Sequence, residues 1–227
     1  DYKKAEMFFL KSSGLDPNFS ESYHGLGWLY RTTYDHEKSI QNFNKYLELE
    51  QENSKGYLGL GWVYLDLYDY EKASSNFLRA MQIEPTNVHN LDGLGWYYYK
   101  TRDYAESKKY FEKIKELTDK DDGSADSGLG WISWSEIDLD KSQEHFKQAL
   151  NLNPDNPRYL IALGWVHHVL NTEGNGFNEF SKAVSIDPNL AEAHHALGWA
   201  YRKKGDLEAS LKSFKFYNIK TTVTLRS

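Results

Sequence analysis

Two pairs of adjacent histidines are the residues in this sequence best suited to binding a metal ion. His167-His168 and His194-His195 occur in consecutive copies of a 34-residue repeat, so His168 and His195 would lie close together on one face. Imidazole is a common zinc ligand, but zinc sites usually complete their ligand set with cysteine or a placed carboxylate. The alternative is that His167 and His194 replace a core tyrosine and a core leucine of other copies. We adopt this alternative and predict no metal site.

The sequence has no residue pattern that is typical of a catalytic centre. It contains no cysteine, and therefore no cysteine nucleophile, thiolate metal site or disulfide. We find no glycine-rich phosphate loop, nucleophile elbow or HExxH motif. The sequence therefore predicts a protein that is not an enzyme and that holds no cofactor.

Tryptophan is the residue whose spacing is most regular. The segment Gly-Leu-Gly-Trp occurs four times and Ala-Leu-Gly-Trp twice, at steps of 34, 34, 35, 34 and 34 residues. An indole ring offers a large apolar surface to a ligand, and aromatic side chains dominate binding hot spots. The six tryptophans of these segments are Trp28, Trp62, Trp96, Trp131, Trp165 and Trp199.

Other residues recur at fixed distances from each tryptophan. A phenylalanine follows fifteen residues later in every copy, and an aspartate follows seven residues later in five of the six. The pattern predicts two helices in each copy. In the first copy, the first helix runs from about Ser20 to Thr33, and the second helix starts after its N-cap Asp35 and ends at about Leu49. Proline near the end of a copy stops the second helix. A period of about 20–50 residues is typical of a solenoid, in which each unit buries its apolar face on its neighbours.

These residues and spacings resemble the tetratricopeptide repeat (TPR), a helix–turn–helix unit of about 34 residues. The resemblance covers almost the whole chain. It implies an all-α fold, a right-handed superhelical solenoid of antiparallel helix pairs, in which the first helices line the concave face and the second helices the outer face. It also implies a protein that carries no chemistry of its own and binds segments of other proteins.

The repeat boundaries predict a single solenoid domain that is a fragment of a longer protein. A trailing half-repeat occupies residues 1–19, and the tail, residues 219–227, is expected to be frayed or extended because it is rich in β-branched side chains. A loose turn is expected at residues 171–176 in the fifth repeat. The six full repeats span residues 20–53, 54–87, 88–122, 123–156, 157–190 and 191–218.

Helical geometry predicts the direction of the tryptophans. A helix turns about 100° per residue, so each tryptophan points away from the apolar stripe that packs on the partner helices. The residue three positions earlier shares the face of the tryptophan and is glycine in four repeats, although a glycine inside a helix costs roughly 0.5–1 kcal/mol. We expect the indole to lie across the next first helix, where this glycine leaves the backbone bare. The four groove-shaping glycines are Gly25, Gly59, Gly93 and Gly128.

The predicted ligand-binding site is a concave groove lined by the six tryptophans. Cationic side chains flank the tryptophans at both ends of the groove, and aromatic side chains flank them in the middle. Tryptophan occupies the place of the asparagine with which some relatives hold a terminal carboxylate, so that function does not carry over. The further groove residues are His24, Arg31, Tyr99, Trp134, His168, His195 and Arg202.

Three hypotheses address the use of this groove. The main one is a scaffold that holds an extended or helical segment of a partner protein. An alternative is a groove for a carbohydrate polymer, as in relatives from bacterial exopolysaccharide export or synthesis systems, because regularly spaced flat indoles suit a chain of sugar rings. The remaining alternative is that the tryptophan ladder is purely structural and only packs on the next repeat.

Charge and hydropathy argue against two classes of partner. The net charge of −6 disfavours nucleic acid, which selects basic surfaces. No apolar run approaches about 18 residues, so no segment is predicted to insert into a membrane. Self-association through uncapped ends is a further hypothesis. The sequence indicates no compartment.

Overall fold

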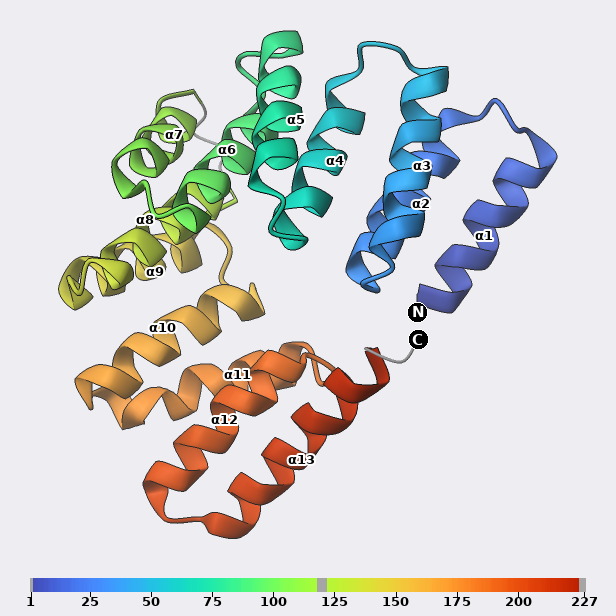
Figure 1. Ribbon diagram of the computed structural model, residues 1–227. Helices are drawn as coiled ribbons and strands as arrows, with labels where there is room; N and C mark the ends of the chain where they lie inside the picture. Colours follow the sequence, from blue (N-terminus) through green and yellow to red (C-terminus); the bar gives the residue numbers. More distant parts are fainter. Residues whose placement is uncertain (1, 118–121, 225–227) are drawn as a thin grey trace. The chain divides into compact units, whose positions relative to one another are not determined.

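The computed structural model describes residues 2–117 and 122–224, and within them the chain forms thirteen α-helices, one 3-10 helix and no strand. The chain divides into two compact units, residues 1–117 and 118–227. Each unit is a series of antiparallel helix pairs, as Figure 1 shows. The all-α repeat architecture predicted from the sequence is therefore confirmed.

Unit 1 contains three first helices and four second helices (Figure 1, blue to green). The first helices are α2 (Ser20–Thr32), α4 (Ser54–Asp66) and α6 (Val88–Lys100). The second helices are α1 (Tyr2–Leu15), α3 (His36–Leu49), α5 (Tyr70–Ile83) and α7 (Tyr104–Leu117). Each first helix packs most closely on the second helix that follows it, and α2, α4 and α6 also contact one another in succession.

Unit 2 repeats this arrangement with one irregular pair. Its first helices are α8 (Ser124–Ser135), α10 (Pro157–Leu170) and α12 (Ala191–Lys204). Its second helices are α9 (Leu139–Leu152), α11 (Phe177–Ile186) and α13 (Leu207–Thr224). Before α11 the chain makes the 3-10 helix η1 (Glu173–Gly176), which contains residues in the left-handed region. The irregular turn expected in the fifth repeat is therefore present.

Aspartate begins the second helix of most repeats. The Asp35 carboxylate accepts a hydrogen bond from the backbone N–H of Lys38 at 3.2 Å, and Asp69 and Asp138 cap α5 and α9 in the same way. Each of these three carboxylates also forms an ion pair with the lysine three residues later. The predicted N-cap of α3 is confirmed, and the same device fixes the start of α5 and α9.

The residue before each capping aspartate adopts a left-handed backbone conformation. This residue is glycine only in the sixth repeat, Gly205, with φ +82°. In four other repeats it carries a side chain, although left-handed φ is costly for residues other than glycine. These residues are Tyr34 (φ 63°), Tyr68 (φ 60°), Arg102 (φ 66°) and Ile137 (φ 65°). Because the Ile137 side chain is also 82% exposed, its packing does not offset the strain of the left-handed backbone.

The core is organised by one buried phenylalanine per repeat. The Phe43 ring of α3 lies between the glycine next to Trp28 in its own repeat and a glycine of the next first helix. A Cβ atom added at Gly27 would lie 2.7 Å from Phe43 Cε1, and one added at Gly59 would lie 2.3 Å from the same atom. Both distances are too short for real atoms, so the ring fits only because both positions lack a side chain. Fully buried phenylalanines occupy this position in five repeats: Phe43, Phe77, Phe111, Phe146 and Phe180.

This contact corrects the role expected for the glycine three residues before each tryptophan. The ring that covers Gly59 and Gly93 belongs to the phenylalanine of the preceding repeat, and Phe9 covers Gly25 in the same way. The expected contact between an indole of the preceding repeat and this glycine is therefore wrong at Gly59 and Gly93, where a phenylalanine ring is the nearest neighbour. Gly128 is buried. Angles on one helix give the face of a glycine but do not tell which neighbouring side chain fills the space beside it.

The end of the chain also differs from the sequence prediction. Residues 219–224 continue α13, which runs from Leu207 to Thr224, whereas frayed or extended chain was expected from Ile219. The helix propensities of β-branched residues are only slightly lower than those of other residues, and tertiary context readily overrides them. The rest of the expected tail, residues 225–227, lies outside the described residues.

We predict that Gly61→Ala destabilises the protein by about 1–3 kcal/mol, the usual cost of overpacking a core. The new Cβ would lie 2.6 Å from Phe77 Cδ1, and that ring is fully buried and lies against Gly93 on the next first helix. Urea denaturation measures the free energy of unfolding. Gly14→Ala is the matched control, because nothing lies within 4 Å of its Cβ and alanine is the better helix former. A Gly61→Ala protein as stable as the control would contradict the proposed packing.

We predict that Ile137→Gly raises the free energy of unfolding by about 0.5–1 kcal/mol, since it removes left-handed strain from a β-branched residue and loses almost no buried surface. The reverse change, Gly205→Ile, should lower it by a similar amount. Thermal and urea denaturation of both variants check the pair. Equal stability of both variants and the unaltered chain would show that these turns carry no strain.

Candidate binding surface

Each tryptophan packs against the buried phenylalanine of its own repeat. The ring centroids of the six Trp–Phe pairs are 5.3–5.8 Å apart, in edge-to-face or tilted arrangements. Five of the six indoles are partly buried, and Trp199 is 37% exposed. The rings are thus fixed by contacts on one side without being enclosed. Each of the six tryptophan residues keeps part of its surface exposed to solvent.

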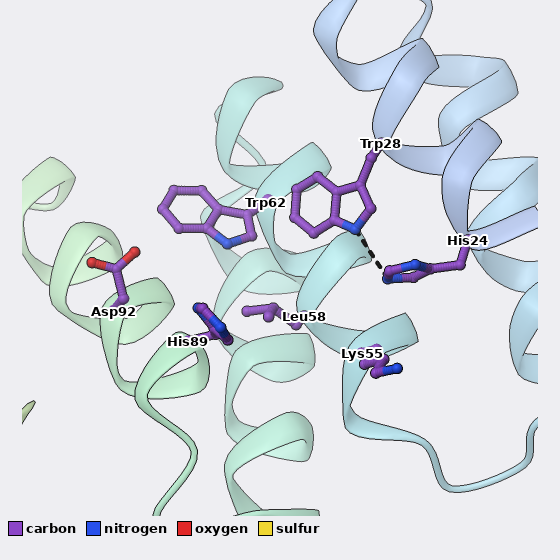
Figure 2. A pocket seen from close by; sticks show the side chains of 7 residues that line it. All are labelled: His24, Trp28, Lys55, Leu58, Trp62, His89 and Asp92. Carbon is purple, nitrogen blue, oxygen red and sulfur yellow. Dashed lines mark hydrogen bonds between the residues drawn. The ribbon is translucent and has the colours of Figure 1, made fainter. Parts of the chain in front are cut away.

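A cavity of about 310 Å³ lies against two of these rings in unit 1. Its walls come from three successive first helices: Trp28 from α2, Leu58 and Trp62 from α4, and residues of α6 (Figure 2). The complete lining consists of His24, Trp28, Lys55, Leu58, Trp62, His89 and Asp92. Unit 1 therefore offers a recess with an apolar floor and polar side chains around it, on the side formed by its first helices.

Arg31 joins the two tryptophans of this cavity. Its guanidinium carbon lies 5.5 Å from the centroid of the Trp28 ring and 5.0 Å from that of Trp62, which are cation–π distances. The same guanidinium donates two hydrogen bonds to Asp66, at 2.7 and 3.2 Å. A bidentate pair of this kind fixes orientation as well as charge. Arg31 thus ties α2 to α4 and holds the two indoles at a set separation.

The same motif of histidine, tryptophan and arginine occurs at Trp28 and at Trp199. The indole N–H of Trp28 donates to His24 Nε2 at 3.0 Å, and that of Trp199 donates to His195 Nε2 at 3.2 Å. Each histidine stands one helical turn before its tryptophan. Arg202 lies 5.1 Å from the Trp199 ring centroid, as Arg31 lies over Trp28. In both motifs the histidine must be neutral at Nε2 to accept the bond.

His168 and His195 both lie beside Trp165. Their ring centroids are 5.5 and 6.2 Å from that of the indole, so the fold brings these two predicted groove residues to the same aromatic side chain. His168 Nδ1 is also 3.2 Å from the backbone oxygen of Asn175. Within residues 2–117 and 122–224, no three histidine, cysteine, aspartate or glutamate side chains are grouped to hold a metal ion.

The aromatic residues expected at the middle of the groove divide between the two units. Trp131 and Trp134 lie edge to face in unit 2, with centroids 6.1 Å apart. Tyr99 lies in unit 1, where it packs on Trp96 at 5.5 Å. A common cluster of Tyr99, Trp131 and Trp134 stays a prediction.

No helix in the described part of the chain is long and apolar enough to cross a membrane.

Sequence analysis missed three residues that shape the unit 1 cavity. Lys55 and His89 line it, and Asp66 holds Arg31. Lys55 stands seven residues before Trp62, and His89 stands seven before Trp96. Seven residues are close to two helical turns, so both side chains share the face of their tryptophan. The helical period could have identified Lys55 and His89, whereas the partner of Arg31 on a neighbouring helix required the structure.

Burial lowers the pKa of the three histidines that were predicted to line the groove below the ordinary value of 6.5: His24, His168 and His195. For His24 the neighbouring Glu21 carboxylate opposes this shift without cancelling it. A histidine whose folded-state pKa is lowered favours folding while it is neutral. Its contribution is present above about pH 6.5 and is lost as the pH falls through the folded-state pKa, because the unfolded chain binds the proton first.

We therefore expect the free energy of unfolding to decrease from pH 7 to pH 5. Urea denaturation at both values measures the decrease. The triple variant His24→Gln, His168→Gln and His195→Gln should lose less stability over this interval, since glutamine does not titrate and can still accept a hydrogen bond. An equal decrease in the variant and in the unaltered chain would contradict a role for these three histidines.

Comparison with known proteins agrees with this architecture. Family models described as the tetratricopeptide repeat match residues 20–53, 54–87, 89–121, 128–156 and 179–212. The BBSome complex member BBS4 of Bos taurus is 30% identical over 87 residues, which are 38% of this chain and 17% of BBS4. The chain thus spans a small part of the length of this relative.

Solved structures show the same fold at low sequence identity. The structure of the APC/C hetero-tetramer Cut9–Hcn1 is similar with a TM-score of 0.71 and 20% identity, over 88% of this chain and 39% of that one. A tetratricopeptide repeat protein from Parabacteroides merdae ATCC 43184 is similar with a TM-score of 0.71 and 16% identity, over 97% of this chain and 87% of that one. Because the family models match more than half of its length, the chain belongs to the tetratricopeptide repeat family.

Proposed function

We propose that the tryptophan-bearing side of the first helices binds an extended or helical segment of a partner protein, and that the chain is a scaffold without catalytic activity. The observation that carries this proposal is the unit 1 cavity, whose lining comes from α2, α4 and α6 together. A ligand seated there would touch three consecutive repeats at once. Such an arrangement suits an elongated segment that crosses several helices.

The family and its relatives support a protein as the partner. TPR proteins generally act as non-catalytic interaction scaffolds, and two similar proteins are named as parts of multi-protein assemblies, the BBSome and the APC/C. The partly exposed indoles and the arginines beside them are side chains that commonly dominate protein interfaces. A glycan polymer, the alternative suggested by the regular indoles, serves as the competing ligand in the test.

The test is a selection of peptides from a phage-displayed library on the full chain, followed by calorimetric titration of the enriched peptides. Six single variants that replace one ladder tryptophan each with alanine should include adjacent positions at which affinity falls at least tenfold, the usual size of a hot-spot loss. Tyr68→Ala is the matched control, because Tyr68 is an aromatic side chain, 71% exposed, in the turn between α4 and α5 and not on a first helix. Far-UV circular dichroism confirms that each variant is folded.

Two outcomes would contradict the proposal. One is that no peptide is enriched, or that all six tryptophan variants bind the enriched peptides as the control does. The other is that polysaccharides, titrated in parallel, change the tryptophan fluorescence while peptides do not, which would favour a carbohydrate groove.

A further inference from the structure

We propose that the cavity between Trp28 and Trp62 receives one large apolar side chain of the partner segment, that the backbone carbonyl of this residue accepts a hydrogen bond from Trp62 Nε1, and that an acidic neighbour in the segment faces Lys55. This inference rests on the proposed function, because it assumes that a protein segment lies along the first helices of unit 1. It adds the chemistry of that segment and the point at which it is anchored.

The size and the floor of the cavity fit a single apolar side chain. Its volume of about 310 Å³ is at the lower end of the range of about 300–1,000 Å³ for small-molecule sites. Leu58 lies at its floor and is 9% exposed, and the Trp28 and Trp62 rings stand above it (Figure 2). Aromatic and large aliphatic side chains gain most from such a recess, because they exchange water for contact with two rings and an isobutyl group.

The recess is held open before a ligand arrives. Arg31 lies against both indoles and is fixed by its bidentate pair with Asp66. Behind the rings, Trp28 packs on Phe43 and Trp62 packs on Phe77, and both phenylalanines are fully buried. The ligand therefore does not have to order these side chains, which lowers the entropic cost of binding.

The two indoles differ in their capacity to bind a ligand through hydrogen bonds. The residue four positions before Trp28 is His24, which accepts the indole N–H at 3.0 Å. The corresponding residue before Trp62 is Leu58, which has no acceptor, and no other described residue accepts the N–H of Trp62. Figure 2 shows this nitrogen on the edge of the ring that faces Leu58 and His89, two further residues of the cavity lining. A backbone carbonyl of the segment can accept its hydrogen bond and replace water there.

Lys55 favours an acidic neighbour on its own side of the recess, well apart from the carboxylate of Asp92 (Figure 2). Lys55 is a half-exposed cation in the lining, and its contact with Glu21, at 3.6 Å, joins two exposed groups and is weak in water. The histidines His24 and His89 add no negative charge, and Asp92 is the one carboxylate among the seven lining residues. A carboxylate beside the anchor can therefore pair with Lys55, whereas a cation there would meet Lys55 as a like charge.

The experiment is a nuclear magnetic resonance titration of the full chain labelled with ¹⁵N in its tryptophan indoles. The probes are three capped peptides: acetyl-Asp-Phe-Asp-amide, acetyl-Lys-Phe-Lys-amide and acetyl-Asp-Ala-Asp-amide. The signal that disappears in Trp62→Phe identifies the indole N–H of Trp62. We expect the first peptide to shift this signal more than that of Trp28, and to bind at least fivefold more tightly than either of the other two.

Two variants test the separate contacts. Trp62→Phe keeps an aromatic ring but removes the N–H donor, and Lys55→Gln removes the charge; each should weaken the first peptide at least threefold. Lys72→Gln is the matched control, because Lys72 is a lysine of comparable exposure on the second helix α5. Circular dichroism and thermal denaturation establish that all three variants are folded.

The outcomes separate this inference from the proposed function. In one outcome, library peptides bind and lose affinity in other tryptophan variants, but no peptide shifts the Trp62 signal and Lys55→Gln changes no affinity. This outcome would contradict the inference and leave the scaffold function supported. Tighter binding of the Lys-Phe-Lys peptide than of the Asp-Phe-Asp peptide would contradict the proposed acidic neighbour. Failure of every library peptide to bind would overturn both.

Discussion

The structure depends on a phenylalanine ring that occupies the space of two absent side chains. Phe43 lies against Gly27 of its own repeat and against Gly59 of the next, at distances that no Cβ could tolerate. Each glycine inside a helix costs roughly 0.5–1 kcal/mol. Burying a phenylalanine side chain contributes roughly 1.5–3 kcal/mol, and removing one from a core costs roughly 3–5 kcal/mol because a cavity remains. The gain from the ring therefore offsets the cost of the two glycines.

The same contact determines how the tryptophans are presented. A phenylalanine ring fills the space beside the glycine next to each tryptophan. The indole therefore does not pack between the helices and instead contacts that phenylalanine ring. One side of the indole is held by the core and the other borders solvent. The tryptophan ladder is in this sense both structural and accessible. Trp28 and Trp62 pack on the core and also line the unit 1 cavity, so a packing role does not exclude the binding role proposed for them.

The sequence predicted the elements of this fold well and their mutual contacts less well. The period of tryptophan and phenylalanine, with Asp35 as a cap, is enough to define paired helices, because these signals act within one helix or its ends. The partners of Gly59 and Arg31 belong to other helices, and their identity depends on how the helices are rotated and spaced. Hydrophobic periodicity does not contain that information. The helical course of residues 219–224 was missed for a related reason, since local propensity is a weak guide once a helix has neighbours.

The buried phenylalanine also crosses the boundary between one repeat and the next. Phe77, for example, requires both its own first helix and the following one, so a repeat is not a self-sufficient folding module. Melting one repeat uncovers a ring that belongs to its neighbour, which couples the stabilities of adjacent repeats within a unit. Hydrogen exchange in the middle of unit 1 would then report cooperative opening of several helices together, rather than independent opening of single pairs.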